Sequence, residues 1–259
     1  MICTTESYGV TDTGRRRQVN QDYVLFDDEL RLYIVADGMG GHSAGEVASK
    51  LAAESVREFV VRSRCSADIS WPFGLDPRLS LNGNCLRSAV MLANARVCDE
   101  AAQHEELYGM GTTIVAAVAE KGVLTICSAG DSRAYRIRSG SIRQLTKDDS
   151  WVQAALDRGV LEEGQARNHI MRNIITKAVG ADDELEPCVV EEETEPGDLY
   201  LMCTDGLHGM LGDAEILGII RASAPDLRKA VDSLIAAANA NGGNDNVTAL
   251  LLRCLSAND

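Results

Sequence analysis

Apolar runs of strand length and of helix length follow one another in blocks, and this order limits the folds open to the chain. Short apolar runs bounded by turn residues indicate buried strands, and apolar spacings of three and four indicate helices. The first part therefore predicts a strand at 32–36, a helix at about 45–62, a loop at 65–83 and a helix at about 84–106. Four strands follow, at 112–119, 122–129, 133–138 and 142–145.

Strands and helices also follow one another in blocks in the second half. It predicts short helices near 150–158 and 161–168, strands at 189–192 and 199–203, helices at about 213–222 and 227–241, and a last strand at 247–254. Closely spaced strands joined by turns pair antiparallel. Such strands combined with paired helices predict an α+β fold with helices packed outside antiparallel sheets. No low-complexity linker and no internal repeat divides the chain, so we expect one domain over residues 1–259.

Charge and cysteine usage narrow the class of partner and the cellular setting. The 39 Asp and Glu exceed the 25 Lys and Arg, which gives a formal net charge of −14 and disfavours binding to nucleic acid or to a membrane surface. None of the eight cysteines forms a C-x-x-C pair, so we expect buried thiols in a reduced protein. The N-terminus has no secretory signal pattern, and no apolar run is long enough to span a membrane. We expect a cytoplasmic protein.

Aspartates recur where the predicted strands begin or end. They are Asp22, Asp37, Asp131, Asp205 and Asp245. Any one of them alone fits ordinary turn chemistry. If they converge, their mutual repulsion requires cations, because two like charges about 4 Å apart cost about 4 kcal/mol at an effective dielectric near 20. Oxygen ligands without a Cys or His set favour Mg²⁺ or Mn²⁺ over zinc.

Six motifs, read in order, resemble those of the metal-dependent protein phosphatases of type 2C. They are Arg17-Gln18-Val19-Asn20-Gln21-Asp22, Val35-Ala36-Asp37-Gly38-Met39-Gly40-Gly41-His42, Gly109-Met110-Gly111-Thr112-Thr113, Gly130-Asp131-Ser132-Arg133, Cys203-Thr204-Asp205-Gly206-Leu207 and Asn244-Asp245-Asn246-Val247-Thr248. The similarity runs from about residue 8 to residue 253, and the compact length is similar to the bacterial branch. It implies a four-layer αββα sandwich and the hydrolysis of phosphoserine and phosphothreonine in proteins, without a phosphoenzyme.

The resemblance also implies a role for individual residues. Two Mn²⁺ or Mg²⁺ ions would be bridged by Asp37, with the Gly38 carbonyl on one of them. Asp205 and Asp245 would complete the coordination of the first ion, and Asp22 would act on the second ion through water.

A third, weaker ion would be held by Asp131 with Asp205. Arg17 would bind the substrate phosphate, and His42 would protonate the leaving serine or threonine oxygen. The implied partners are phosphorylated proteins and a cognate Ser/Thr kinase, and we expect a monomer.

Position 21 and the segment at about 148–180 bear on the metal site and on the flap. Many family members have Glu where this chain has Gln21, so occupancy of the second metal position is an open question. The segment at about 148–180 resembles the flap of bacterial members, and we expect a structural role for its His169.

Two alternatives stay open. One is a phosphoprotein-binding module with little turnover, motivated by Gln21. The other is a nucleotide-binding enzyme, motivated by Gly38-Met39-Gly40-Gly41. The second fits poorly, because the pattern Gly-x-Gly-x-x-Gly fails at Ser43 and no Gly-x-x-x-x-Gly-Lys-Ser/Thr motif occurs.

Overall fold

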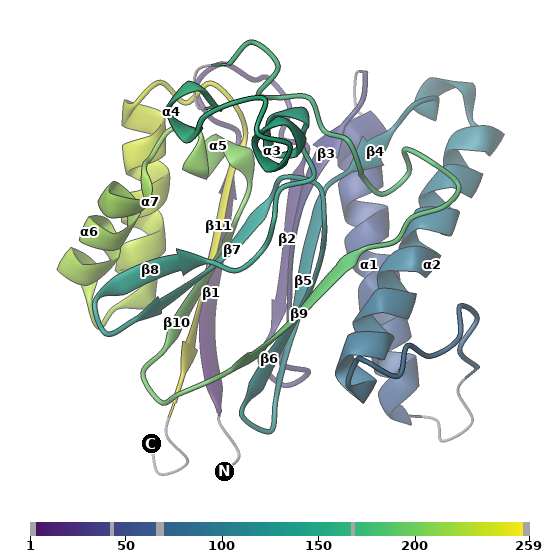
Figure 1. The fold of residues 1–259 in the computed structure, drawn as a ribbon, viewed down its shortest axis with the longest axis horizontal. Helices are drawn as coiled ribbons and strands as arrows, with labels where there is room; N and C mark the ends of the chain where they lie inside the picture. Colours follow the sequence, from purple (N-terminus) through teal and green to yellow (C-terminus); the bar gives the residue numbers. More distant parts are fainter. Residues whose placement is uncertain (1–3, 42–43, 66–69, 167–168, 256–259) are drawn as a thin grey trace.

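Two antiparallel β-sheets lie face to face at the centre of the molecule (Figure 1). The computed structural model describes residues 4–41, 44–65, 70–166 and 169–255. The first sheet has the order β1-β11-β10-β7-β8, formed by Thr5–Asp12, Val247–Cys254, Leu199–Cys203, Arg133–Arg138 and Ser141–Gln144. The second has the order β2-β3-β5-β6-β9, formed by Asp22–Asp27, Leu32–Met39, Ile114–Glu120, Val123–Ala129 and Cys188–Glu193; the short β4 (Gly111–Thr112) also pairs with β3.

A pair of helices covers the outer face of each sheet (Figure 1). Helices α1 (Ala44–Cys65) and α2 (Leu81–Gln103) pack on the second sheet, and α6 (Asp213–Ser223) and α7 (Leu227–Ala240) pack on the first. Shorter helices lie at one end of the sandwich, which is the upper end in Figure 1: α3 (Trp151–Asp157), α4 (Glu163–Ala166) and α5 (Asp205–His208). A 3₁₀ turn, η1 (Glu105–Leu107), follows α2.

Alternate residues of the central strands enter different hydrophobic cores. In β3, Leu32 and Ile34 face the helix pair α1–α2, whereas Tyr33 and Val35 face the other sheet. Strand β10 does the same, with Leu201 facing the α6–α7 side. Because both faces of these strands are buried, their sequences are continuous apolar runs rather than alternating ones. Three cores separate four layers, so the predicted αββα sandwich is confirmed.

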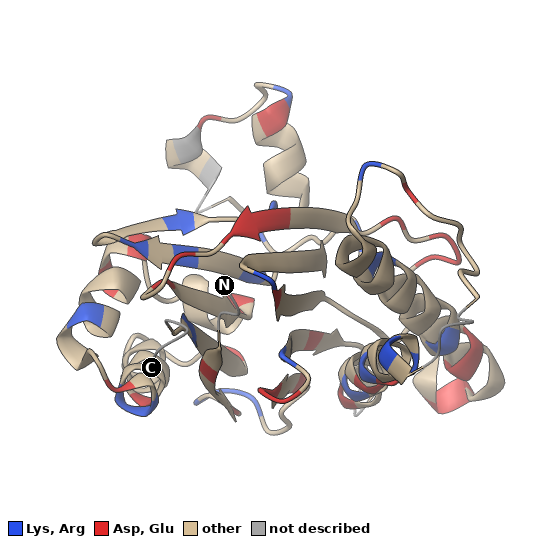
Figure 2. Cartoon of the chain, turned by 90° about the horizontal axis from the view of Figure 1, so that it is seen from below, with Lys and Arg blue, Asp and Glu red and all other residues tan. Residues whose placement is uncertain are grey.

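Ion pairs tie the two sheets together at one edge. Strand β9 ends in three glutamates, and Figure 2 shows this acidic run beside basic positions of neighbouring strands. Glu192 accepts hydrogen bonds from Arg136 of β7 and, at 2.7 Å, from Arg143 of β8. Arg138 donates to Asp198 and, at 2.7 Å, to Glu195. Much of the charge on this edge is therefore internally balanced.

Several elements differ from the prediction. Strand β1 was not predicted, because its sequence TESYGVTD has few apolar residues and it forms through pairing with β11. Helix α2 begins at Leu81 rather than near 84, because Ser80 caps it by accepting a hydrogen bond from the Gly83 amide at 3.1 Å. The strand predicted at 112–119 is interrupted at Thr113, which separates β4 from β5.

Other expectations concern thiols and membranes. Cys85, Cys127, Cys203 and Cys254 are buried, as expected. The expectation is wrong for Cys65 and Cys188, which are exposed at the end of α1 and the start of β9, and Cys98 is only half-buried. Cys3 lies outside the described residues. None of the helices in the described ranges is long and apolar enough to cross a membrane.

Candidate functional site

Two of the predicted aspartates face each other across neighbouring strands. Asp22 begins β2 and Asp37 lies near the end of β3, and the two residues are direct partners in the antiparallel register. The backbone of Asp37 is fixed by the segment between β4 and β5: its carbonyl accepts from the Thr113 amide at 2.9 Å and from Thr112 Oγ1 at 2.8 Å. The strand pairing alone therefore places two carboxylates side by side at one end of the second sheet.

The other three aspartates reach the same place from the first sheet and from the strand connections. Asp205 is the first residue of α5, directly after β10, and Asp245 precedes β11. Asp131 lies between β6 and β7. All of them, together with Asp22, interact electrostatically with Asp37. The structure thus brings all five predicted aspartates together.

Burial makes ionisation of this cluster costly. Loss of solvent is the largest cause that raises the pKa of Asp22 to about 7, of Asp131 to about 7 and of Asp205 to about 6. Burial, followed by the charge of Asp22, also holds the pKa of Asp37 well above its usual range. At neutral pH the cluster therefore has strong affinity for positive charge, whether protons or cations.

Two buried carboxylate oxygens point specifically to a missing partner. Among the described residues, Oδ1 of Asp22 and Oδ1 of Asp205 are buried and accept no hydrogen bond. Leaving such an acceptor unpaired is unfavourable, and an all-oxygen donor set suits Mg²⁺ or Mn²⁺. Within the described ranges no three Asp, Glu, His or Cys side chains already form a ready-made coordination geometry. The residues fit a divalent ion in donor chemistry, and binding would have to draw the oxygens together.

Threonine and asparagine side chains for which no role was predicted hold the cluster in place. Oδ2 of Asp22 accepts hydrogen bonds from Thr204 Oγ1 at 2.9 Å and from Thr248 Oγ1 at 2.6 Å. Asn246 accepts from the Gln21 amide at 2.8 Å and donates to the Val19 carbonyl at 3.0 Å. Thr204 and Thr248 are fully buried, and the sequence around them gives no local signal for this support.

Close backbone packing explains the glycine after Asp37. The Gly38 amide donates to the Gln21 carbonyl at 3.1 Å, and a Cβ atom at Gly38 would lie 2.0 Å from the Gly45 carbonyl oxygen. The Gln21 side chain also lies here, because a Cβ at Gly45 would come 2.7 Å from its Nε2. Strand β3, the 13–21 loop and the start of α1 therefore meet with no room for a side chain at position 38.

Arg17 is a cation at the border of the cluster. Its Nη2 lies 2.7 Å from Asp245 Oδ2, and this hydrogen bond is the largest cause that raises the pKa of the guanidinium. The Arg17 side chain is 51 % exposed, so further donors of its fork face solvent. The predicted proton donor His42 lies outside the described residues.

The segment predicted as a flap lies beside the cluster. A cavity of about 490 Å³ separates α3 and the 172–173 segment from Asp131, Asp205 and His208. His208 is buried, its Nε2 lies 3.1 Å from the Asp131 carbonyl oxygen, and burial lowers its pKa to about 3. His169 stacks on Trp151 at 5.0 Å between ring centroids, in keeping with a structural role.

The raised carboxylate pKa values predict how stability of the metal-free protein varies with pH. Between the ordinary value of 3.8 and about 7, the folded protein holds protons that the unfolded chain has lost. The free energy of unfolding should therefore fall as pH rises from 5 to 7, by about 1.4 kcal/mol per pH unit for each such proton. His208 acts in the opposite direction below pH 6.5, but it is one group against several carboxylates.

Urea unfolding in EDTA at pH 5, 6 and 7 measures this slope. We expect a flatter profile for Asp205→Asn, which removes one of the buried carboxyl groups. Metal-free stability that is constant or rises over this range would contradict the buried acidic cluster.

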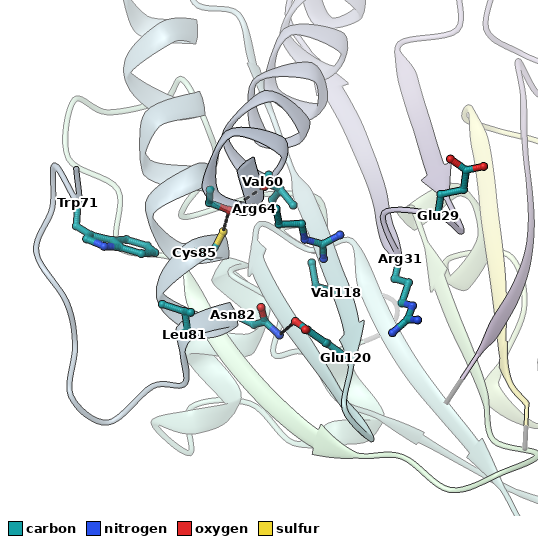
Figure 3. Close-up of a pocket in the computed structure, with 11 residues that line it drawn as sticks. Glu29, Arg31, Val60, Arg64, Trp71, Leu81, Asn82, Cys85, Val118 and Glu120 are labelled. Atoms are coloured by element: carbon teal, nitrogen blue, oxygen red, sulfur yellow. Dashed lines mark hydrogen bonds between the residues drawn. The ribbon is translucent and has the colours of Figure 1, made fainter. Parts of the chain in front are cut away.

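A second cavity, of about 600 Å³, lies at the far end of α1 and is unrelated to the cluster (Figure 3). Trp71 and Leu81 line one side of it, and Arg31 and Arg64 lie on another. Trp71 also packs edge-on against Phe59, with ring centroids 6.2 Å apart. The 22-residue α1 separates this cavity from the aspartates by about 30 Å along its axis.

Comparison with known proteins gives one consistent family. The family model described as protein phosphatase 2C matches residues 12–252. The serine/threonine phosphatase stp of Listeria welshimeri is 34 % identical over 249 residues, covering 93 % of each chain. The serine/threonine protein phosphatase PstP of Mycobacterium tuberculosis is 35 % identical over 241 residues, which are 93 % of this chain and 43 % of PstP.

Solved structures agree with the sequence comparisons. The crystal structure of Mycobacterium tuberculosis PstP superposes with a TM-score of 0.85 at 32 % identity, covering 98 % of this chain and 100 % of that one. A structure of the PstP catalytic domain in complex with two manganese ions has a TM-score of 0.83 at 32 % identity, covering 99 % and 100 %.

Proposed function

Because the chain belongs to the protein phosphatase 2C family, we propose that its five-aspartate cluster is the catalytic centre of a protein serine/threonine phosphatase. The chain is a metal-dependent phosphomonoester hydrolase, and its cofactors are two Mn²⁺ or Mg²⁺ ions. One observation carries the assignment of the site. Within the ranges that the structure describes, the buried carboxylates of Asp22 and Asp205 each have an oxygen without a hydrogen bond, beside an arginine suited to phosphate.

We assign the ion-binding roles to particular residues of the cluster. Asp37 would contact both ions, because it is the carboxylate that interacts with all the others. Coordination of the first ion would be completed by the Gly38 carbonyl, Asp205 and Asp245. Asp22 would act on the second ion through water. When bound, the two ions supply an activated water for attack on phosphorus and offset charge on the phosphoryl oxygens.

A third, weaker ion would be held by Asp131 and Asp205, whose carboxylates interact across the cavity beneath the flap. Gln21 can orient water by hydrogen bonding but adds no charge. Occupancy of the second position would then depend more on Asp22 and Asp37.

Two side chains would handle the substrate itself. Arg17 would bind the phosphoryl oxygens, because a guanidinium offers paired donors that match phosphate and its remaining donors face solvent. His42 would give a proton to the leaving serine or threonine oxygen. Without it the leaving group departs as a poorly stabilised alkoxide, and such donors contribute about 10²–10⁴-fold.

The proposal also covers the substrates, the location and the oligomeric state of the protein. The substrates are phosphorylated proteins, and we propose that they include a cognate Ser/Thr kinase and its targets in the cytoplasm. We further propose that residues 1–259 act as one monomeric domain, with the 148–180 flap adjoining the site.

Phosphate release from a phosphothreonine peptide tests the function. We expect steady turnover with 1 mM Mn²⁺, loss of turnover in excess EDTA, and recovery when Mn²⁺ is restored. An unphosphorylated peptide should give no phosphate, and a serine analogue of the substrate should be hydrolysed. Turnover that persists after complete chelation would refute the proposal. Tight phosphopeptide binding without turnover at saturating Mn²⁺ would favour the binding module instead.

A further inference from the structure

The loop that carries Arg17 also presents two arginines that the catalytic proposal does not use. Arg15 and Arg16 directly precede Arg17, and all three are exposed. Within the described residues, Arg17 is ion-paired with Asp245, but neither neighbouring guanidinium has a hydrogen-bond or ion-pair partner. Although acidic residues outnumber basic ones in the chain, these two guanidinium groups lack an acidic partner in the part of the chain that the structure describes and are available to an external anion.

The backbone of this loop is firmly held, so the two arginines have a defined place. The amides of Arg15 and Arg16 both donate to the Gly243 carbonyl, at 2.8 and 3.2 Å. Asn246 donates to the Thr13 carbonyl at 2.9 Å and to the Val19 carbonyl, which fixes both ends of the loop. These contacts are to the same 243–246 segment that carries Asp245. The arginine positions are therefore organised relative to the cluster before any substrate binds.

The left-handed conformation of Gly14 brings the loop close to that segment. Its φ is +79°, and a Cβ there would lie 2.1 Å from the Asp245 carbonyl oxygen. The loop can approach the cluster this closely only with glycine at that position. The arginines that follow are consequently held at the border of the site.

We propose that Arg15 and Arg16 select substrates that carry a second anionic group near the phosphorylated residue. This inference rests on the proposed phosphatase function, with the substrate phosphate at Arg17. The Cα atoms of Arg15 and Arg17 are at most about 7 Å apart, which matches two residues of extended peptide. The second anion is therefore an acidic side chain or another phosphoryl group about two residues from the scissile phosphate.

Charge balance within the fold supports this choice of ligand. Some arginines elsewhere, such as Arg133 and Arg138, are paired with buried or half-buried carboxylates. Among the described residues the guanidinium groups of Arg15 and Arg16 have no partner, so their side-chain donors remain for an external anion, in a molecule whose mean field repels anions. A local cationic border gives such a substrate its favourable contact at this site and steers its approach.

Three phosphothreonine peptides of equal length test the inference. One has neutral flanks, one has Asp two residues on either side, and one has a second phosphothreonine two residues away. We expect wild-type kcat/KM to be roughly three- to tenfold higher for the two anionic peptides at low salt, mainly through a lower KM. The advantage should shrink at 0.3 M NaCl because exposed charges are screened.

Substitutions of the two arginines test whether they cause the preference for anionic peptides. Arg15→Gln/Arg16→Gln should bring the anionic and neutral peptides to within about twofold of each other, and Arg16→Gln alone should act partway. Arg62→Gln on α1, an exposed arginine far from the cluster, makes the same charge change and should keep the wild-type preference. Arg15→Glu/Arg16→Glu should make the neutral peptide the better substrate.

The outcomes separate this inference from the proposed function. The substrate p-nitrophenyl phosphate has no flanking residues, so its hydrolysis with Mn²⁺ reports on the catalytic centre alone. This hydrolysis should be unchanged in Arg15→Gln/Arg16→Gln. Equal wild-type kcat/KM for all three peptides, or a preference that survives in that variant, would overturn the inference. If only the doubly phosphorylated peptide is favoured, the selected anion is phosphoryl; if both are favoured, a carboxylate suffices.

Discussion

Asp37→Asn should lower kcat/KM for a phosphothreonine peptide by about 10³-fold or more at 1 mM Mn²⁺. Asp37 interacts with each of the other four carboxylates and stands in register with Asp22. Asparagine keeps the shape of the side chain but removes the charge and one acceptor oxygen. The loss should therefore come from weaker ion binding, and titration calorimetry should show much reduced Mn²⁺ affinity.

The same variant has a second, opposite expected effect. Burial penalises the ionised form of Asp37, so at pH 7.5 the metal-free Asp37→Asn protein should be at least as stable as metal-free wild type. A merely structural aspartate would lose stability on this change. Asp76→Asn, in a distant loop where Asp76 is paired with Arg78, is the control and should retain activity within about twofold. Asp37→Asn activity above a tenth of wild type would contradict the assignment.

Gly38→Ala should destabilise the protein by about 3 kcal/mol or more. The added Cβ would lie 2.0 Å from the Gly45 carbonyl oxygen and 2.5 Å from the Gln21 carbonyl oxygen, and both are backbone atoms that cannot rotate away. Strand β3, the 13–21 loop and α1 would have to separate next to Asp37. Urea unfolding with EDTA measures the loss of stability, and Mn²⁺ affinity should fall as well.

Gly218→Ala is the matched control for that substitution. Gly218 lies inside α6, and a Cβ there meets nothing within 4 Å. Alanine has the higher helix propensity, so this variant should gain about 0.5–1 kcal/mol. Comparable stabilities for the two variants would show that close packing at Gly38 does not constrain the site.

The layer order of the fold could be predicted because it follows from local sequence. Runs such as Leu32–Ala36 and Leu199–Cys203 are apolar at every position, and the structure buries both faces of these strands. Strand β1 could not be predicted in this way, because Thr5–Asp12 is only half-buried and depends on pairing with β11, the last strand of the chain. The predicted start of α2 was wrong because the helix cap, Ser80, lies within the 65–83 segment that was expected to be a loop.

The acidic residues of the site could be predicted from the sequence, but the side chains that hold them by hydrogen bonds could not. The motifs marked the five aspartates, and the structure gathers them. The hydrogen bonds of Thr204 and Thr248 to Asp22 join residues separated by 182 and 226 positions, so no local pattern could reveal them. Asn246 likewise fixes the 13–21 loop from the other end of the chain. Such contacts follow from the pairing of β10 and β11 next to β2, a property of the tertiary structure.

A crystal of the protein grown with Mn²⁺ and measured at the manganese absorption edge tests the central claim most directly. The account predicts two strong anomalous peaks among the aspartates, both next to Asp37, with Asp205 and Asp245 at one of them. It further predicts that the peaks disappear in Asp37→Asn crystals grown in the same way. A phosphatase-active preparation whose crystals show manganese elsewhere and none at the aspartates would contradict it.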